Sequence, residues 1–405
     1  MSKTITHIVT KKQLVPELRF KGFDEEWKIK QLGDVSKFLD GKRKPIKSED
    51  RSKMKGEYPY YGASGIIDYV NSYIFDQELI LLGEDGENII SRNLPLAFRV
   101  SGKCWINNHA HVIVPNLDTN IDFLTHSLEK INYVVYNTGT AQPKLNQEVC
   151  RSIPSWYPSL PEQQKIASFL SAVDEKIQQL THKKELLEQY KKGVMQQLFC
   201  GKLRFKDESG KENANWEEKR LGDILELQHG YQFRTSDFTK EGLAIIKISN
   251  VIGNNLYLQD LSFINSNRLK EFSRFEISKG DILMSLTGNI GRVIEVESVP
   301  FKMIQNYRVG KFVPYDSNYL SKKFTKHLLM SDVVFGRFGQ LSNQSAQANF
   351  GKQDMDKILV SIPLLSEQLK IANFLSNIDS KIESTSQQIT QTQTFKKGLL
   401  QKMFV

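Results

Sequence analysis

The chain contains residue types that can do covalent or metal chemistry, but their spacing forms no recognisable catalytic site. His109 and His111 are two residues apart, which would place both side chains on one face of a β-strand. A metal ion would need a further ligand, and the nearby sequence offers none at a typical spacing. The acidic turn at Glu84, Asp85 and Glu87 is interpreted as a surface turn. We therefore predict no catalytic residue and no metal site.

Sequence motifs for nucleotide or cofactor chemistry are also missing. The chain has no G-x-x-x-x-G-K-[ST] phosphate loop, no G-x-G-x-x-G after a predicted strand, and no H-E-x-x-H or G-x-S-x-G. It also lacks the Asn-Pro-Pro or Asp-Pro-Pro motif of amino-methyltransferases. A nuclease would need carboxylates set to hold Mg²⁺, and no spacing singles out such a set. We predict that the chain binds no cofactor of its own.

Basic, polar and aromatic loop residues suit a different chemistry, the binding of nucleic acid. Residues 37–55 carry eight Lys or Arg against three acids, and such cations neutralise phosphates, although a solvated loop can have the same composition. Asn, Gln, Arg and Ser can read base edges, and they are also common turn residues. The candidate DNA-binding residues are Lys42, Arg43, Lys44, Tyr60, Tyr61, Asn108, His109, Thr140, Gln142, Lys144, Arg234, Lys247, Asn250, Thr287, Asn289, Asn306, Arg308, Asn343, Gln344 and Gln347.

The composition is that of a globular protein with room for two or three domains. The 405 residues are 40% hydrophobic and 25% charged, with a net charge of +9 that permits a polyanionic partner. Three widely separated cysteines without a C-x-x-C pair argue against disulfides and zinc ribbons. No apolar run reaches the roughly 18 residues of a membrane span, and the N-terminus lacks a signal-peptide core. We expect a cytoplasmic protein.

A repeat of two long segments organises the chain and must position these loops. Residues 160–199 and 365–404 are identical at 17 of 40 positions when they are aligned without gaps at an offset of 205 residues. An ungapped match of this length is a strong repeat signal. As a helix, each copy would be about 60 Å long at 1.5 Å per residue.

The first copy carries a heptad seam, so it requires a partner helix. Lys184 and Lys191 fill the two positions at which the apolar repeat is interrupted. The second copy can supply the partner from within the chain, and we predict an antiparallel coiled coil. A simple oligomerisation helix is the alternative. The apolar seam residues are Ile166, Leu170, Val173, Ile177, Leu180, Leu187, Val194 and Leu198.

The segment that precedes each globular block is repeated as well. LRFK occurs at residues 18–21 and 203–206, and each copy is followed by a tryptophan, Trp27 or Trp216, and then by Leu-Gly-Asp. The second helix ends where a further LRFK would follow, and that motif lies near the N-terminus instead. The order is therefore cyclic, and we predict neighbouring chain ends and an approximate two-fold axis.

The two blocks between these repeats contain short β-rich runs punctuated by Gly, Asn and Pro. One short helix is expected in each, near residues 121–131 and 317–335. We predict an α+β fold, with two globular domains separated by two long helices. The domains are 1–158 with the lead-in, the helix 159–202, the second globular domain 203–364 and the helix 365–405. Because the block interiors diverge while the helices match, we expect one scaffold with two differently specialised heads.

Aromatic residues that lie away from the seam predict a further protein partner. They occur at matching positions of the two long segments, as a sticky surface would require. The candidate docking residues are Phe169, Tyr190, Phe199, Phe374, Phe395 and Phe404.

The pattern resembles the specificity subunit of type I restriction–modification systems. The likeness is carried by EQQKIA at residues 162–167 and EQLKIA at 367–372, and by the tails that begin with KKG at 191–193 and 396–398. GTAQPKL at 139–145 and GYQF at 230–233 add to it. The resemblance covers nearly the whole chain, but it is specific only for the helices and their flanks.

This resemblance implies that each head is a target recognition domain reading one half of a bipartite, asymmetric site in double-stranded DNA. The helix pair would set the spacing and dock two modification (methyltransferase) subunits. Those subunits would bind S-adenosylmethionine, and separate restriction subunits would use ATP and Mg²⁺. The chain itself would be non-catalytic.

Two other classes of function are possible. A stand-alone, two-headed DNA-binding or architectural protein would bind a specific sequence tightly without a methyltransferase. An enzyme with atypical motifs would bind a cofactor or modify DNA as the purified chain.

Overall fold

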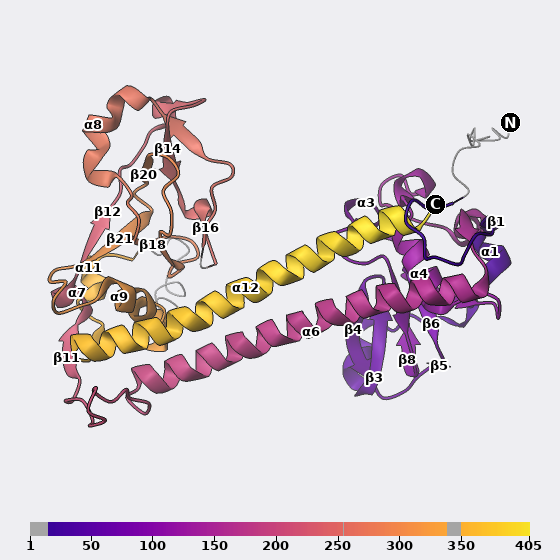
Figure 1. The fold of residues 1–405 in the computed structure, drawn as a ribbon, viewed down its shortest axis with the longest axis horizontal. Helices are drawn as coiled ribbons and strands as arrows, with labels where there is room; N and C mark the ends of the chain where they lie inside the picture. Colours follow the sequence, from indigo (N-terminus) through magenta and orange to yellow (C-terminus); the bar gives the residue numbers. More distant parts are fainter. Residues whose placement is uncertain (1–14, 254, 338–349) are drawn as a thin grey trace. The chain divides into compact units, whose positions relative to one another are not determined.

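The computed structural model describes residues 15–253, 255–337 and 350–405. The chain divides into two units, one ending at His182 and resuming at Ser386, the other spanning Lys183–Thr385. Two long helices, α6 (Leu160–Phe199) and α12 (Leu365–Met403), pass from one unit into the other (Figure 1). Each unit thus holds one head and parts of both helices, which confirms the cyclic repeat. Among these residues, no helix is long and apolar enough to cross a membrane.

The first head contains two four-stranded sheets, and the larger part of its core lies on the first of them. That sheet has the order β2-β9-β6-β7 with antiparallel neighbours. Every residue of β6 is buried, which explains why its sequence LILLG is apolar without alternation. The strands are β2 (Ser36–Phe38), β9 (Ala110–Pro115), β6 (Leu79–Gly83) and β7 (Ala97–Val100).

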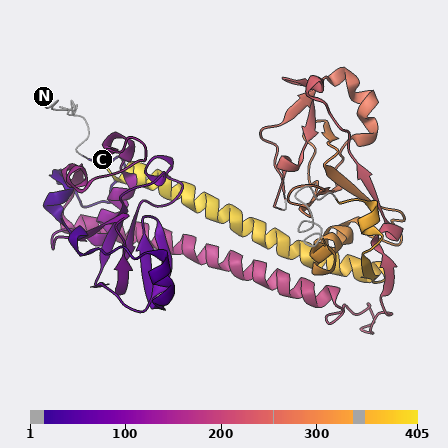
Figure 2. The same ribbon diagram turned by 180° about the vertical axis from the view of Figure 1, so that it is seen from behind.

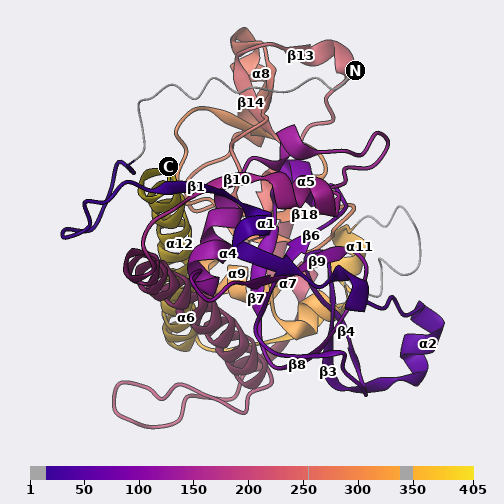
Figure 3. The same ribbon diagram turned by 90° about the vertical axis from the view of Figure 1, so that its right-hand side faces the viewer.

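The second sheet of this head has the order β4-β3-β8-β5, in which β3 and β8 are parallel. The short helix α2 (Ser48–Lys53) lies at the edge of the head beside β3 and β4 (Figure 3). Arg51 of α2 pairs with Asp68 of β4 at 3.4 Å, which holds the helix there. The strands are β4 (Gly65–Val70), β3 (Lys55–Gly62), β8 (Lys103–Ile106) and β5 (Phe75–Asp76).

The main helix of the first head is α4 (Ile121–Lys130), which packs on β6, β7 and β9. It begins where predicted because the Asn120 side chain accepts a hydrogen bond from the Phe123 N–H at 3.0 Å. The remaining helical segments are α1 (Leu32–Val35), η1 (Asp40–Lys42), α3 (Asn88–Ser91), η2 (Tyr133–Tyr136) and α5 (Gln147–Ser152).

The second head repeats both sheets. One has the antiparallel order β12-β21-β18-β19, and the other has the order β13-β17-β14-β20 with β14 parallel to β20. The strands are β12 (Leu225–His229), β21 (Val309–Pro314), β18 (Ile282–Ser285), β19 (Val293–Glu295), β13 (Phe238–Thr239), β17 (Ser262–Ile264), β14 (Leu243–Ile246) and β20 (Met303–Gln305). A hairpin of β15 (Val251–Ile252) and β16 (Asn255–Leu256) is added.

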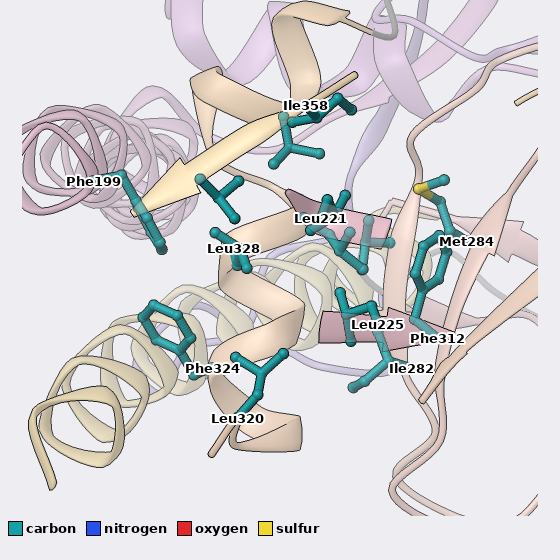
Figure 4. Close-up of a cluster of buried hydrophobic side chains, with 14 of the residues drawn as sticks. Phe199, Leu221, Leu225, Ile282, Met284, Phe312, Leu320, Phe324, Leu328 and Ile358 are labelled. Carbon is teal, nitrogen blue, oxygen red and sulfur yellow. The ribbon is translucent and has the colours of Figure 1, made fainter. Parts of the chain in front are cut away.

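The core of the second unit joins the head to the end of α6. Figure 4 shows Phe199 of α6 facing Phe324 of α9 (Lys322–Leu329), with ring centroids 5.6 Å apart. Helix α9 covers part of the predicted range 317–335, and residues 332–337 are also helical. Further helical segments are α7 (Leu221–Ile224), η3 (Thr235–Asp237), η4 (Ile248–Asn250), η5 (Ser266–Arg268), α8 (Leu269–Phe272), η6 (Ser273–Phe275) and α11 (Lys352–Met355).

Each head is closed by pairing its first strand with its last. In the first unit β1 (Lys28–Gln31) pairs with β10 (Pro154–Tyr157), and in the second unit β11 (Glu217–Arg220) pairs with β22 (Leu359–Ile362). The long helix follows the closing strand directly. The head and the start of its helix therefore form one piece.

The Glu-Gln pair at the start of each long helix forms the joint to the head. Glu162 is 1% exposed and accepts two hydrogen bonds from Arg19 of the first LRFK, at 2.7 and 2.8 Å. Glu367 does the same with Arg204 in the second unit. Gln163 accepts from the Asn120 N–H just before α4. The repeated motifs thus have a physical reason, since they connect lead-in, head helix and long helix.

Within each unit, the two long helices run side by side in opposite directions (Figures 1 and 2). In the first unit Lys396 pairs with Asp174 at 2.6 Å, and in the second unit Lys191 pairs with Asp379 at 2.6 Å. These equivalent pairs confirm the antiparallel arrangement. They also explain Lys191, one of the two lysines that interrupt the seam, whereas Lys184 pairs with Glu188 of its own helix at 3.9 Å. The limits of the two units fall inside α6 and α12. The predicted domain boundaries at residues 158, 202 and 364 therefore stay a prediction.

Candidate nucleic-acid interface

Four segments of the first head meet at one end of its first sheet, and the sequence marks three of them for DNA binding; the fourth, residues 84–87, is the predicted surface turn. We call residues 40–44, 84–87, 107–109 and 137–145 the first loop cluster. Backbone hydrogen bonds hold it together: the Glu84 N–H donates to the His109 carbonyl at 2.8 Å, and the Leu145 N–H donates to the Glu84 carbonyl at 2.7 Å. The Lys44 N–H donates to the Ile106 carbonyl at 3.3 Å.

Most of the predicted site residues of this cluster are exposed together. Lys42 and Lys44 make no ion pair within the described part of the chain, so both ammonium groups are available to an anion. Lys144 is exposed but pairs with Glu84 at 3.3 Å, and His109 lies 2.8 Å from Asp85. The exposed candidates are Lys42, Lys44, Asn108, His109, Thr140, Gln142 and Lys144.

The predicted role of Tyr60 is wrong. Its side chain is 1% exposed, and its hydroxyl accepts a hydrogen bond from the Ile46 N–H at 3.0 Å. Side chains alternate along β3, and Tyr60 faces inward, where its ring and Arg51 are in contact. Tyr61 is half-buried and packs against Phe98.

Arg43 also differs from its predicted role, because it is held inside the head. Its guanidinium pairs with Glu84 at 2.6 Å and with Asp40 at 3.5 Å. Asp40 in turn lies 2.6 Å from Nδ1 of His111, a buried residue on β9. This contact has no local signal in the sequence, because Asp40 and His111 are 71 positions apart.

Hydrogen bonding makes His111 a cation. Burial would lower its pKa, but the interactions with Asp40 and Cys150 together outweigh burial and raise the pKa to about 10. Its Nε2 lies 2.9 Å from the Leu145 carbonyl, which only accepts, so both ring nitrogens donate. Burial would likewise raise the pKa of Asp40, yet His111 and Arg43 hold it below its usual value.

This arrangement favours an ion-pair network over a metal site. Asp40, Glu84 and His111 do place three potential ligand atoms within 4.8 Å of one another. A doubly protonated imidazole has no lone pair for a metal, however, and Arg43 already neutralises Glu84. The acidic turn at residues 84–87 is therefore partly structural, since Glu84 is not a freely solvated surface residue.

The second head gathers its predicted segments in the same way. We call residues 230–234, 286–291 and 305–308 the second loop cluster. The Tyr231 N–H donates to the Gln305 carbonyl and the Tyr307 N–H donates to the Tyr231 carbonyl, both at 3.0 Å. The Leu286 N–H donates to the Arg308 carbonyl at 2.9 Å.

The exposed candidates in this cluster are Arg234, Asn289 and Arg308. Lys247 is half-buried beside it and donates to the Ser262 hydroxyl at 2.6 Å. The Thr287 hydroxyl is buried, and it finds no hydrogen-bond partner among the residues that the structure describes. Asn343, Gln344 and Gln347 lie outside the described residues.

The predicted roles of Asn250 and Asn306 are corrected, because both side chains stabilise their own turns. Asn250 is 1% exposed, and its amide donates to the Tyr257 carbonyl at 3.0 Å. Asn306 is 8% exposed and accepts from the Arg308 N–H at 3.2 Å. Asparagine commonly makes such local bonds in turns, which is why composition alone suggested a recognition residue.

The two clusters are equivalent parts of the repeat. Asn107 in the first head accepts a hydrogen bond from the amide two residues on, as Asn306 does in the second. The Phe350 N–H donates to the Leu286 carbonyl just as the Leu145 N–H donates to the Glu84 carbonyl. The same backbone frame thus presents different side chains in each head.

The candidate docking residues separate into exposed and buried groups. Phe169, Tyr190 and Phe395 are 36%, 54% and 55% exposed, and Phe374 is half-buried. Phe199 and Phe404 were wrongly predicted as docking residues. Phe404 stacks on Phe123 at 5.2 Å, and Phe199 is likewise buried against its own head helix.

Comparison with known proteins agrees with this layout. Residues 24–189 and 213–393 match the type I restriction modification DNA specificity domain. The type I restriction enzyme MjaVIII specificity subunit of Methanocaldococcus jannaschii is 27% identical over 398 residues, which cover 93% of this chain and 91% of the relative. The EcoprrI specificity subunit of Escherichia coli is 31% identical over 160 residues, 39% of this chain and 38% of the relative.

Two solved structures share the fold. The S subunit of a type I restriction-modification system from M. genitalium has a TM-score of 0.63 and 14% identity, covering 96% of this chain and 99% of that one. A second structure, which concerns complex assembly and conformational transition of the type I R-M system, has a TM-score of 0.52 and 15% identity. It covers 94% of this chain and 98% of its own.

Two repeated heads, each presenting a polar loop cluster and each joined to the same two long helices, define a class of two-headed recognition proteins. Within this class, the chain belongs to the type I restriction–modification DNA specificity family, because the domain of that family matches both of its repeats.

Proposed function

We propose that the chain is the DNA-specificity subunit of a type I restriction–modification complex. Each head reads one half of a bipartite, asymmetric site in double-stranded DNA. The observation that carries this proposal is the pair of equivalent loop clusters with different exposed side chains, such as Lys44 and Gln142 in the first and Arg234 and Arg308 in the second. The same backbone arrangement with two different sets of exposed side chains is suited to reading two different half-sites.

The long helices set the spacing between the half-sites and dock two modification subunits. Each unit carries an equivalent pair of aromatic residues away from the seam, namely Phe169 and Phe395 in the first unit and Phe374 and Tyr190 in the second. A repeated docking surface fits two copies of the same partner.

The chain contributes recognition rather than catalysis. In this function the modification subunits bind S-adenosylmethionine and methylate the DNA, and restriction subunits use ATP and Mg²⁺. The support from this chain is the chemistry of its loop clusters, whose charged and polar groups suit hydrogen bonding to DNA.

Co-expression tests the proposal. The chain is produced in a methylation-free host together with a type I modification (methyltransferase) subunit from the same genome, and the host DNA is sequenced for methylated bases. We expect a two-part sequence motif with a fixed spacer that is methylated only when both proteins are present. Methylation by the methyltransferase alone at the same motif would contradict the proposal.

The stand-alone alternative is tested with the same materials. The full chain is purified with and without the methyltransferase, and binding to duplexes that carry the methylated motif is measured. Equal affinity and equal sequence preference without the methyltransferase would favour a self-sufficient DNA-binding protein.

A further inference from the structure

Four charged residues meet on the buried side of the first loop cluster, and three of them belong to its segments. Asp40 follows β2, Arg43 lies in the adjoining basic loop, Glu84 follows β6, and His111 is on β9. Arg43 is 2.6 Å from Glu84, and His111 is 2.6 Å from Asp40. Cross-pairs at 3.5 Å, between Arg43 and Asp40, and at 3.8 Å, between His111 and Glu84, close the group. We call these four residues the ionic bracket.

Three members of the ionic bracket, Arg43, His111 and Asp40, also hold the backbone of a neighbouring segment with their side chains. Arg43 donates to the Ala110 carbonyl at 2.8 Å, and His111 donates to the Leu145 carbonyl at 2.9 Å. Asp40 accepts from the Val112 N–H at 2.8 Å. Because the Glu84 backbone bonds to residues 109 and 145, the bracket connects all four segments of the first loop cluster.

Burial distinguishes the bracket from the exposed candidates around it, of which Lys144 pairs with Glu84 at 3.3 Å. The side chains of Arg43, Asp40, Glu84 and His111 are only 13%, 7%, 12% and 1% exposed. Lys44, the next residue after Arg43, is exposed and has no ion pair in the described ranges. Arg43 would have to abandon its carboxylates to reach a phosphate, whereas Lys44 would give up nothing.

The second head has no counterpart of the bracket among its described residues. The strand registers place Gly310 where the first head has His111, and Leu286 where it has Glu84. The Leu286 side chain lies over Gly310: a Cβ added to Gly310 would be 2.8 Å from Cδ2 of Leu286. Apolar packing therefore replaces the ion pairs at this place.

We propose that the ionic bracket is a set of positioning residues that fix the loop conformations of the first head and thereby determine which half-site sequence that head accepts, without touching the DNA. This inference rests on the proposed function. It assigns Arg43 a role different from that of its neighbours in the basic loop, and it confines the effect to one half of the DNA site.

Two matched variants test the inference, because Arg43→Gln and Lys44→Gln each remove one positive charge from the same loop. Binding is measured with the full chain in its methyltransferase complex, on duplexes of the methylated motif and on duplexes substituted in either half-site. Each series is repeated over a range of salt concentrations. The melting temperature of every variant is recorded.

For Arg43→Gln, we expect discrimination within the first half-site to fall about tenfold, discrimination within the second to be unchanged, and the salt slope to stay at the unaltered value. For Lys44→Gln, we expect uniformly weaker binding and a salt slope lower by about 0.9, as for a lost phosphate contact. Arg43→Gln acting like Lys44→Gln, or lowering discrimination in both half-sites equally, would overturn the inference.

Arg43→Lys covers the case in which Arg43→Gln does not fold. This variant keeps the positive charge but cannot make all the hydrogen bonds of the guanidinium. If Arg43 is a positioning residue, we expect discrimination in the first half-site to be lost. Full discrimination with Arg43→Lys would mark a simple charge contact. Failure of the proposed function gives a different result, since the unaltered complex would then show no sequence discrimination at all.

Discussion

Neighbouring residues in the loop clusters differ in exposure and in hydrogen bonding, because their side chains point in different directions. Arg308 is exposed at the second loop cluster, whereas Asn306, two residues earlier, uses its amide oxygen to hold the Arg308 N–H. The exposed guanidinium donates at 2.7 Å to the hydroxyl of Tyr307 and keeps other donors available. This geometry leaves Arg308 able to read a guanine edge.

The first prediction, at the residue scale, concerns Arg308. Changing Arg308→Ala should cost about 1–3 kcal/mol of binding free energy and relax sequence preference at one position of the second half-site, because a bidentate contact to a base is lost. Binding to a panel of single-base substituted duplexes measures the preference. Lys302→Ala, which removes an exposed cation of the same head paired with Glu276, serves as the control. A uniform loss across the panel would assign Arg308 to the DNA backbone instead.

At the scale of elements, two buried histidines lie where each head helix packs against the long helices. His126 of α4 lies 3.9 Å from Asp174 and near Lys396, and burial, followed by Lys396, lowers its pKa to about 4. His327 of α9 is buried near Lys191 and Lys326, and its pKa is lowered to about 3 for the same reasons. Both residues are therefore neutral in the folded protein near neutral pH.

The second prediction is a loss of stability on acidification. The unfolded chain binds protons at these histidines below their ordinary pKa of 6.5, whereas the folded chain does so only at about 4 for His126 and about 3 for His327. The contribution of these two histidines to stability should be complete above pH 6.5. It should fall by about 1.4 kcal/mol per pH unit for each histidine as the pH drops from 6.5 toward the pKa of that histidine in the folded chain. Urea unfolding between pH 7 and 5 measures this slope, which His126→Gln should reduce for the first unit. An unchanged slope in that variant would contradict the explanation.

The long helices offer a second element-scale test, which concerns their outer faces. Tyr190→Glu and Phe395→Glu change exposed residues in different units, so the fold should be retained. We predict that each single variant binds one methyltransferase subunit instead of two, and that the double variant binds none, because a buried carboxylate opposes docking. Native mass spectrometry counts the subunits. Gln393→Glu, an exposed position elsewhere on α12, is the control, and two bound subunits in the double variant would rule out these surfaces.

At the scale of the whole molecule, the important property is that both helices belong to both units. Inside each unit the helices are paired by an equivalent lysine and aspartate, Lys396 with Asp174 and Lys191 with Asp379. A change made where the units meet, after His182 in α6 and after Thr385 in α12, leaves these pairs intact.

The fourth prediction uses this property. Inserting seven residues at both places preserves the heptad pattern and lengthens each helix by about 10.5 Å, or about three base pairs of DNA. The methylated motif should keep both half-sites and gain about three base pairs of spacer, which methylome sequencing detects. Insertion into α6 alone should disturb the pairing and abolish methylation. An unchanged spacer after the double insertion would refute the role of the helices as a ruler.

Patterns carried by contiguous sequence were sufficient for the architecture. The offset of 205 residues, the heptad seam and the cyclic order of LRFK, head and helix predicted the two heads and the antiparallel helices. These features are local or repeated, and secondary structure follows directly from their periodicity. Most of the loop segments that cluster in each head were also singled out, because polar and basic residues between strands are visible in the sequence; the turn at residues 84–87 was not among them.

Only the tertiary structure decided which of those loop residues face the solvent. Tyr60 and Asn250 are buried because strand orientation and long-range packing determine burial. For the same reason Phe404 packs on Phe123 of α4, and Phe199 packs on Phe324 of α9. The pairing of Asp40 with His111 bridges 71 positions and has no local signature. Its energy depends on removing both charges from water, a condition that exists only after the strands have paired and the loops have closed over them.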